Sequence, residues 1–262
     1  MHKWDAEDYR RHSSVQLAWG RELIAKLALK DTESVLDVGC GDGKVTAEIA
    51  ATAPNGHVLG IDNSREMISL AVKSYSANRY ANLKFRLMDA REIPFENEFD
   101  VVFSNAVLHW VKEHRAVLQG IARSLKCPGR ILLQMGGRGN VQEMVTAVVE
   151  LTCLTKWKQY FSGFVSPYRF CGPEEYRIWL EEAGLDPVRV ELIQKDMTHK
   201  GREGLLGWIR TTWHPFLDRV PDDLRQVFLE EAVDLYLVGH PLGKDGVAHV
   251  SAVRLEVEAV KK

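Results

Sequence analysis

Short apolar runs alternate with amphipathic stretches through the first half of the chain. The apolar runs are SVLDVG (34–39), HVLGID (57–62), LKFRLMD (83–89), FDVVFSN (99–105) and RILLQMG (130–136). Apolar residues recur with helical spacing near 43–53, 64–77 and 112–126. The runs are apolar on both faces, as strands covered by helices must be. Strands that alternate with helices through short loops predict βαβ units and a parallel sheet.

The second half of the chain is mostly helical but carries two more strand patterns. Strand alternation occurs at 187–194 and 246–262, and helical patterns occupy 15–29, 139–160, 173–183 and 201–240. The helix at 15–29 is expected to cover the edge of the sheet. We predict one α/β domain. Its parts are an N-terminal helical segment 1–32, a core sheet of 33–137 and 187–262, and helical cap segments 139–185 and 200–243.

Composition and charge narrow the class of protein. The 262 residues are 45% hydrophobic, which is enough for a core, and the formal net charge of −2 offers no basic field for nucleic acid or an anionic membrane. Apolar runs are too short to span a bilayer, and the charged N-terminus lacks a signal-peptide core. The four cysteines form no CxxC pair, so neither a metal site nor a disulfide is expected. We expect a cytoplasmic protein, and a monomer is the favoured oligomeric state.

The stretch VLDVGCGDGKVTAEIA (35–50) forms a turn with three glycines, Gly39, Gly41 and Gly43. A phosphate-binding P-loop requires Ser or Thr after the lysine, but Val45 stands there. A dinucleotide fingerprint requires the third glycine one residue later, and the acidic Asp42 in the turn would repel a pyrophosphate. The remaining candidate is an adenosyl cofactor that carries no phosphate.

The segment VLDVGCGDG resembles the first motif of the S-adenosylmethionine-dependent methyltransferases with a Rossmann-like fold. The resemblance implies that Asp37 binds the amino acid end of the cofactor, Asp62 the ribose hydroxyls and Asp89 the adenine amino group. Any one aspartate could instead cap a turn or helix, but successive strand ends carry the expected residue type in order. The full set of cofactor-binding residues implied is Asp37, Gly39, Cys40, Gly41, Asp62, Asn63, Asp89, Ala90 and Asn105.

The same resemblance implies the fold, a seven-stranded Rossmann-like (class I methyltransferase) sheet. Its last strand is antiparallel and is preceded by a helical insertion. The strand patterns at 187–194 and 246–262 would form the final pair. The helical stretch between them would lie where it can cover the site.

Two further resemblances concern the methyl acceptor. The segments NAVLHWVKEHRAVLQGIARSLKCPGRILLQM and, more loosely, WIRTTWHPFLDRVPDDLRQVFLEEAVDLYLVGHP are similar to the trans-aconitate methyltransferases. YRRHSSVQ, followed by DVGCGDGKVT and LHWV, resembles the juvenile hormone acid methyltransferases. In carboxyl methyltransferases of this kind a glutamine and a tryptophan hold the substrate carboxylate, which implies that role for Gln16 and Trp110. Amide and indole N–H groups donate hydrogen bonds, and a carboxylate accepts them.

A carboxylic acid is already ionised at neutral pH, so its methylation requires alignment and exclusion of water but no general base. Other acceptors would more often require a base, and His109 and His214 are the candidates; His109 would otherwise pack beside Trp110 and orient it. This leaves a methyltransferase acting on a carbon, hydroxyl or nitrogen as an alternative, and a non-catalytic cofactor-binding module as another. A nucleic-acid methyltransferase is disfavoured, because SNAVLHW stands where an Asn-Pro-Pro-aromatic stretch would be expected.

One departure from the trans-aconitate family bears on specificity. An arginine is expected where TTWHP carries His214, because a tricarboxylate has additional charges that arginine pairs well. Arg138, Arg169 and Arg210 are the candidate replacements. A group of aromatic residues indicates an acceptor with an apolar body, although each of them could equally pack in a helical core. They are Trp157, Tyr160, Phe161, Phe164, Trp208 and Trp213.

Overall fold

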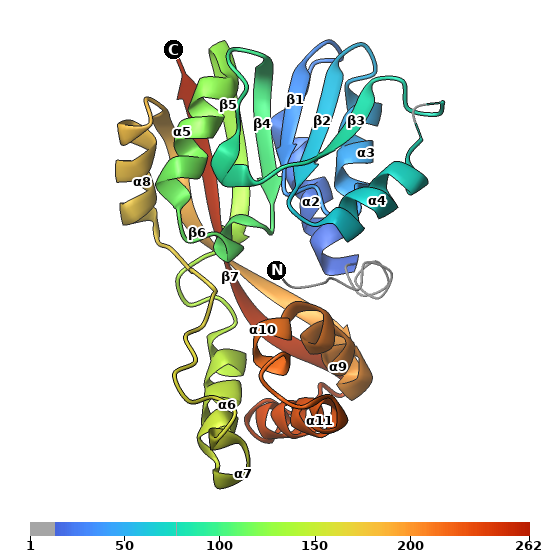
Figure 1. The fold of residues 1–262 in the computed structure, drawn as a ribbon, viewed down its shortest axis with the longest axis vertical. Coiled ribbons are helices and arrows are strands. Elements are labelled where there is room, and N and C mark those ends of the chain that lie inside the picture. Colours follow the sequence, from blue (N-terminus) through green and yellow to red (C-terminus); the bar gives the residue numbers. More distant parts are fainter. Residues whose placement is uncertain (1–13, 77) are drawn as a thin grey trace.

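The computed structural model describes residues 14–76 and 78–262, with side chains from residue 17 onwards. Figure 1 shows a twisted sheet with helices on both faces and, below it, a smaller helical cap. Two long strands, β6 and β7, run from the sheet into the cap. None of the helices in the described ranges combines the length and apolar character that a membrane crossing requires.

The seven strands form one mixed sheet in the order β3-β2-β1-β4-β5-β7-β6. Only β7 runs against its neighbours, since it pairs antiparallel with both β5 and β6 while the other pairs are parallel. This confirms the predicted class of fold. The strands are β1 Ser34–Val38, β2 His57–Asp62, β3 Leu83–Leu87, β4 Phe99–Asn105, β5 Leu125–Gly136, β6 Asp186–Lys200 and β7 Val247–Lys261.

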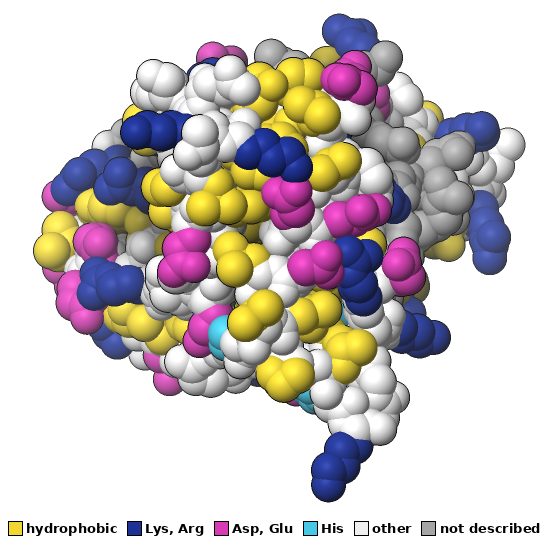
Figure 2. Space-filling view, turned by 90° about the horizontal axis from the view of Figure 1, so that it is seen from below, with side chains coloured by type: hydrophobic (Ala, Val, Ile, Leu, Met, Phe, Trp, Pro, Cys, Tyr) yellow, Lys and Arg dark blue, Asp and Glu magenta, His cyan; other side chains and the backbone are white. Residues whose placement is uncertain are grey.

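The helices divide into two groups. Those packed on the sheet are α2 Ser14–Leu27, α3 Lys44–Thr52, α4 Arg65–Ser74, α5 His114–Ser124 and α8 Pro173–Glu182. Those of the cap are α6 Gln142–Cys153, α7 Thr155–Lys158, α9 Gly201–Thr212, α10 His214–Leu217 and α11 Asp222–Gly239. Two 3₁₀ turns, η1 Ala90–Glu92 and η2 Leu108–Trp110, follow β3 and β4. Figure 2 views the molecule from below, where apolar, acidic and basic side chains are interspersed.

Helix α2 covers the face of the sheet, and the prediction that it covers an edge is wrong. Its buried Leu23 and Leu27 belong to the same core cluster as Val35, Val101 and Leu132. These three residues lie on β1, β4 and β5, which occupy the middle of the sheet. The apolar side of α2 is therefore buried over the central strands, next to the glycine turn.

The cap differs from the segments expected for it in two respects. Helix α8, inside the expected range 139–185, packs on the sheet, since Tyr176 and Leu180 share the core cluster of Ile121 on α5. Strand β6 continues past 194 to Lys200, because it stays paired with β7 along its whole length. The far ends of both strands then enter the cap core, where Met197 and Val250 are buried.

A buried carboxylate on β7 links three elements. Glu256 is fully buried; it accepts hydrogen bonds from Lys26 on α2 (2.6 Å) and Gln134 on β5 (2.8 Å), and Arg189 on β6 also pairs with it. Burial alone would raise the pKa of Glu256, but these donors outweigh it and hold the pKa below its usual value. The charged form is therefore the stabilising one, and its contribution is lost as the pH falls through the lowered pKa.

We expect Glu256→Gln to destabilise the protein at pH 7 by about 1–3 kcal/mol, because Lys26 and Arg189 lose their shared anion. The difference between variant and wild type should shrink at low pH, where the wild-type carboxylate is protonated. Urea denaturation at pH 7 and at about pH 3, well below the usual glutamate pKa of about 4.3, measures both effects. Glu182→Gln, which breaks an exposed pair with Arg115, is the control and should leave the midpoint unchanged. Equal behaviour of the two variants at pH 7 would contradict this account.

Candidate active site

A cavity of about 370 Å³ lies between the carboxyl ends of the parallel strands and the cap. Ligands of open α/β sheets bind at this edge, at the point where the strand order changes direction. Here that point lies between β1 and β4, because β2 and β3 follow β1 on one side and β5 follows β4 on the other. All nine residues expected to contact the cofactor line the cavity, and so do His109, Trp110 and His214. The side chain of Gln16 lies outside the described residues, although its backbone belongs to α2.

The glycine turn connects β1 to α3, and all three of its glycines have positive φ. The space beside Gly41 is open, because a Cβ there would meet nothing within 4 Å. A Cβ on Gly39 would lie 2.3 Å from a methyl group of Val107, so this glycine is required for packing. Gly43 is the left-handed N-cap of α3 and lies against Phe85. Both Gly39 and Gly41 line the cavity, but only Gly41 has open space where a side chain would stand.

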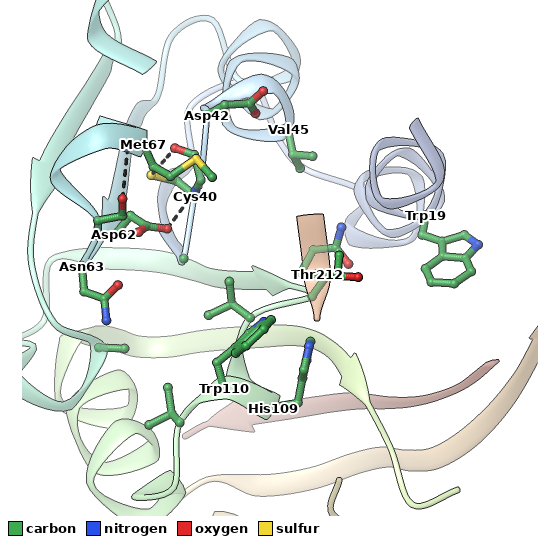
Figure 3. Close-up of a pocket in the computed structure, with 18 of the residues that line it drawn as sticks. Trp19, Cys40, Asp42, Val45, Asp62, Asn63, Met67, His109, Trp110 and Thr212 are labelled. Carbon is green, nitrogen blue, oxygen red and sulfur yellow. Dashed lines mark hydrogen bonds between the residues drawn. The ribbon is translucent and has the colours of Figure 1, made fainter. Parts of the chain in front are cut away.

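Asp62 fixes the position of this turn. One of its carboxylate oxygens accepts the backbone N–H of Gly41 (3.0 Å), and the other accepts that of Ser64 (2.8 Å). In Figure 3 Asp62 and Cys40 lie on one side of the cavity, and Asn63 follows beside them. Burial raises the pKa of Asp62, and the backbone N–H groups of Ser64, Gly41 and Asn63 offset part of that rise. A carboxylate has about four acceptor positions, so Asp62 can still accept a hydroxyl from a ligand.

Asp37, at the end of β1, is 2% exposed, and it accepts a hydrogen bond of 2.7 Å from the Thr46 hydroxyl. Burial raises the pKa of Asp37 to about 7; the Thr46 hydroxyl lowers it in part, and the nearby Asp62 adds to the rise. A carboxylate held in this way is stabilised by a cation that enters the cavity.

Asp89, which follows β3, pairs with Arg91. Its two oxygens accept N–H groups of the Arg91 guanidinium at 3.0 and 2.7 Å, and one of them also accepts the Arg91 backbone N–H. The side-chain hydrogen bond from Arg91 is the main reason that the pKa of Asp89 is lowered. Asp89 is thus an ionised acceptor at the rim of the cavity, next to Ala90.

This half of the cavity fits a positively charged adenosyl cofactor without phosphate. Among the described residues, four carboxylates and one lysine line it, and this lysine, Lys44, pairs with Asp42 at 3.2 Å. The acidic surroundings would repel a phosphate but favour a sulfonium and an ammonium group. The open backbone at Gly41 leaves room for close approach of a ligand. The four carboxylates belong to Asp37, Asp42, Asp62 and Asp89.

His109 and Trp110 lie on the opposite side of the cavity (Figure 3). The backbone N–H of Gly136 donates to Nδ1 of His109 at 3.3 Å, which assigns the ring proton to Nε2. Desolvation by the surrounding protein, followed by the charges of Arg254 and His114, holds the pKa of His109 well below its usual value. His109 is therefore a neutral hydrogen-bond donor at physiological pH.

Trp110 is enclosed by residues from distant parts of the chain. The His214 ring from the cap stacks on it with a centroid separation of 4.9 Å and an interplanar angle of 10°. Tyr168 meets it edge-on at 4.8 Å, and the Tyr168 hydroxyl donates to the Thr212 carbonyl at 2.7 Å. Cap and sheet thus meet through the stacked rings of His214 and Trp110. These rings line the side of the cavity opposite the carboxylates.

Several lining residues were not singled out from the sequence. Trp19 on α2, Tyr168 and Phe170 before α8, and Arg254 on β7 carry no local motif; only the three-dimensional arrangement of the elements brings them to the cavity. Phe170 stacks parallel to Tyr168 with an interplanar angle of 3°. Alternation along β7 was a usable signal for Arg254, since this cation stands within a buried strand.

The arginines expected to pair with a polyanionic acceptor lie elsewhere. Arg138 is exposed and pairs with Glu174 and Glu175, Arg169 lies over the Trp179 ring at 5.6 Å, and Arg210 is exposed on α9. None of these three lines the cavity. Of the six aromatic residues, Trp208 and Trp213 line it. The other four form or border the core of the cap; they are Trp157, Tyr160, Phe161 and Phe164.

Comparison with known proteins identifies the family. The methyltransferase domain family matches residues 29–184. An uncharacterized methyltransferase of Schizosaccharomyces pombe is 35% identical, over 81% of this chain and 83% of its own. The trans-aconitate 2-methyltransferase of Methylobacterium nodulans is 28% identical, over 94% of this chain and 93% of its own.

A solved structure agrees in fold. Phosphoethanolamine N-methyltransferase 2 of Haemonchus contortus, in complex with phosphomonomethylethanolamine and S-adenosylhomocysteine, matches with a TM-score of 0.57 at 23% identity, over 93% of this chain and 52% of that one. The sequence matches are the stronger evidence, because they cover most of the chain and include the glycine turn and all four strand ends. The chain therefore belongs to the methyltransferase domain family and is an S-adenosylmethionine-dependent methyltransferase.

Proposed function

We propose that this enzyme methylates a carboxylate oxygen of a small organic acid and so forms a methyl ester. The observation that carries the proposal is the state of His109. Its Nδ1 already accepts the Gly136 N–H, and its pKa is held well below the usual value. The imidazole next to Trp110 therefore donates a hydrogen bond and does not take up a proton.

Tyr168 is no better suited to remove a proton. Burial holds its pKa well above the usual value, and its hydroxyl donates to the Thr212 carbonyl. Such a site suits an acceptor that is already deprotonated when it binds, because neither side chain can remove a proton from it. Carboxylic acids are ionised at neutral pH, whereas phenols, alcohols and ammonium groups are not deprotonated there.

The acceptor carboxylate would be oriented by neutral donors. Trp110 offers an indole N–H, His109 its Nε2–H, and Gln16 an amide N–H. When bound, S-adenosylmethionine supplies a methyl group on a positive sulfur; the new O–C bond forms as the S–C bond breaks, which leaves a neutral thioether. Neutral donors aim the oxygen without neutralising its charge, so it remains nucleophilic. The aromatic enclosure excludes water, which would compete for the same donors.

On this proposal the cofactor occupies the acidic half of the cavity. Asp37 would bind the cofactor ammonium, Asp62 the ribose hydroxyls and Asp89 the adenine amino group. Gly41 would offer its backbone to the ligand. The remaining contacts would come from Gly39, Cys40, Asn63, Ala90 and Asn105.

Two further observations support a small acid. Relatives named trans-aconitate 2-methyltransferase are 26% to 28% identical to this chain over most of its length. The face shown in Figure 2 mixes both signs of charge with apolar groups, so it lacks the uniform basic surface typical of nucleic-acid binding. We also infer that sheet and cap form a single methyltransferase domain, in which the cap closes the acceptor side.

The proposal is tested by incubation with methyl-labelled cofactor and a panel of mono-, di- and tricarboxylic acids. We expect a labelled product that base hydrolyses to methanol. Trp110→Phe keeps an aromatic ring but removes the indole N–H, and we expect it to lower kcat/KM about 10-fold or more, since it removes a hydrogen bond to a charged group. Trp179→Phe, on α8 outside the cavity, is the matched control. A base-stable product, or unchanged turnover in Trp110→Phe and Gln16→Ala alike, would refute carboxylate methylation.

Asp37→Asn should stabilise the apoprotein above pH 7 and weaken cofactor binding. Because burial raises the pKa of Asp37 to about 7, the folded protein keeps a proton that the unfolded chain releases above about pH 4. The stability contributed by Asp37 therefore falls as the pH rises between these two values and is constant above them. At pH 8 the asparagine should gain roughly 1–2 kcal/mol, a typical gain when a site trades stability for function.

Urea denaturation at pH 5 and pH 8 and calorimetric titration with S-adenosylmethionine measure the two effects of Asp37→Asn. We expect affinity for the cofactor to fall about 10-fold or more, because a charged hydrogen bond is lost. The exposed carboxylate of Asp223, on α11, provides the control Asp223→Asn. A variant that is less stable than wild type at pH 8, or that binds the cofactor unchanged, would contradict the role given to Asp37.

A second candidate is methylation of a carbon, hydroxyl or nitrogen with His214 as the base. The observation that favours it is the position of this ring, which is 8% exposed and stacked on Trp110 beside the acceptor space. The pH dependence of kcat distinguishes the candidates. For a carboxylate we expect a flat profile between about pH 5.5 and 8.5 in wild type and in His214→Gln. An inflection near pH 6–7 that disappears in His214→Gln would establish the base mechanism instead.

A further inference from the structure

Arg254 lines the acceptor side of the cavity. Histidines aside, no other described residue that lines this side is charged. It is 5% exposed and lies on β7, at the point where that strand passes from the sheet to the cap. The other charged lining residues belong to the turn and strand ends of the cofactor half. They are Asp37, Asp42, Lys44, Asp62 and Asp89.

The alternation of β7 directs Arg254 toward the cavity. Residues 252, 254 and 256 share one face of the strand. On this face Ala252 also lines the cavity, while Glu256 is bound by Lys26 of α2. Arg254 lies over the Trp19 ring of the same helix, with its guanidinium carbon 5.1 Å from the ring centroid. The indole therefore supports the planar guanidinium within the wall of the cavity.

Arg254 is also close to the proposed acceptor subsite. Its partner across the β5–β7 ladder is Gly136, the residue whose N–H binds His109. Its positive charge is, after desolvation, the next largest cause of the low pKa of His109. A carboxylate-bearing molecule held at His109 and Trp110 would thus extend within the field of this cation.

We propose that Arg254 is a specificity-determining residue that binds a second anionic group of the acceptor, next to the carboxylate that is methylated. The inference rests on the proposed function. A cation paired with the reacting oxygen would withdraw charge from it and slow the attack, whereas a cation paired with a distant carboxylate binds without that cost. A guanidinium fork also suits a carboxylate in two-point contact, and a dry aromatic wall strengthens the pairing.

In this arrangement different protein groups bind the two carboxylates of the acceptor. Neutral N–H groups hold the oxygen that reacts, and the charged fork holds the group that does not. It also accounts for the absence of Arg138, Arg169 and Arg210 from the lining of the cavity, because β7 supplies the cation that those three were expected to supply. The preferred acceptor is then a di- or tricarboxylate with a short carbon chain.

Binding of two acids that differ only in the second carboxylate tests the proposal. Glutaconate and 2-pentenoate share a five-carbon unsaturated chain, and each is titrated calorimetrically into the full chain with S-adenosylhomocysteine present. We expect wild type to bind glutaconate at least about 10-fold more tightly, as expected for a charge-assisted hydrogen bond. Arg254→Met should remove this preference and leave 2-pentenoate binding unchanged, and Arg254→Lys should retain part of it. Arg138→Met is the control and should behave as wild type.

A purely structural role, in which Arg254 only holds α2 through Trp19, predicts a different result. Arg254→Met would then weaken both acids, and the affinity for S-adenosylhomocysteine, by similar factors. That result would overturn the proposal, as would equal affinity of wild type for the two acids or binding of neither.

Ester formation from the same two acids is measured in parallel samples that contain methyl-labelled S-adenosylmethionine instead of S-adenosylhomocysteine, and it separates the two hypotheses. Binding that depends on Arg254 without any ester would refute carboxylate methylation and leave the role of Arg254 supported. Ester formation with no dependence on Arg254 would refute the role of Arg254 and leave carboxylate methylation supported.

Discussion

The antiparallel ladder between β6 and β7 determines how the two parts of the molecule meet. Each strand has 15 residues, and they remain paired from Asp186↔Val260 to Lys200↔Val247. One end of the ladder belongs to the sheet and the other to the cap core, so a single hydrogen-bonded element crosses both. This rigid connection places the His214 ring over Trp110 and carries Arg254 into the wall of the cavity.

Charge is distributed unequally across the cavity that results. Buried or partly buried carboxylates surround the cofactor half, and their raised pKa values at Asp37 and Asp62 reflect a cost of folding that a bound cation would offset. In the half proposed for the acceptor, the described residues place neutral donors at His109 and Trp110 and a cation, Arg254, on β7. We interpret this asymmetry as complementary to the reaction, in which a positive sulfur and a negative oxygen meet and both become neutral.

The sequence predicted the sheet well, because each strand and helix of the first half carries its own periodicity and the aspartates stand at strand ends. It placed α2 at an edge because periodicity shows that a helix has an apolar side but not which strands that side covers. It missed Tyr168, Phe170 and Arg254 because their position in the site depends on contacts between distant segments. The departure at His214 was visible in the sequence. Arg254 was visible only as a cation within a strand pattern, and that pattern does not show that its side chain lines the cavity.

The claim on which this account depends is that the acceptor site contains no base at His109. The most direct measurement is the ¹⁵N chemical shifts of the His109 ring in the S-adenosylhomocysteine complex between about pH 5 and 8, where an ordinary histidine titrates. We expect a neutral ring with the proton on Nε2 at every pH, because the Gly136 N–H occupies Nδ1 and the pKa lies well below this range. Titration of His109 within the range, or a proton on Nδ1, would contradict the account.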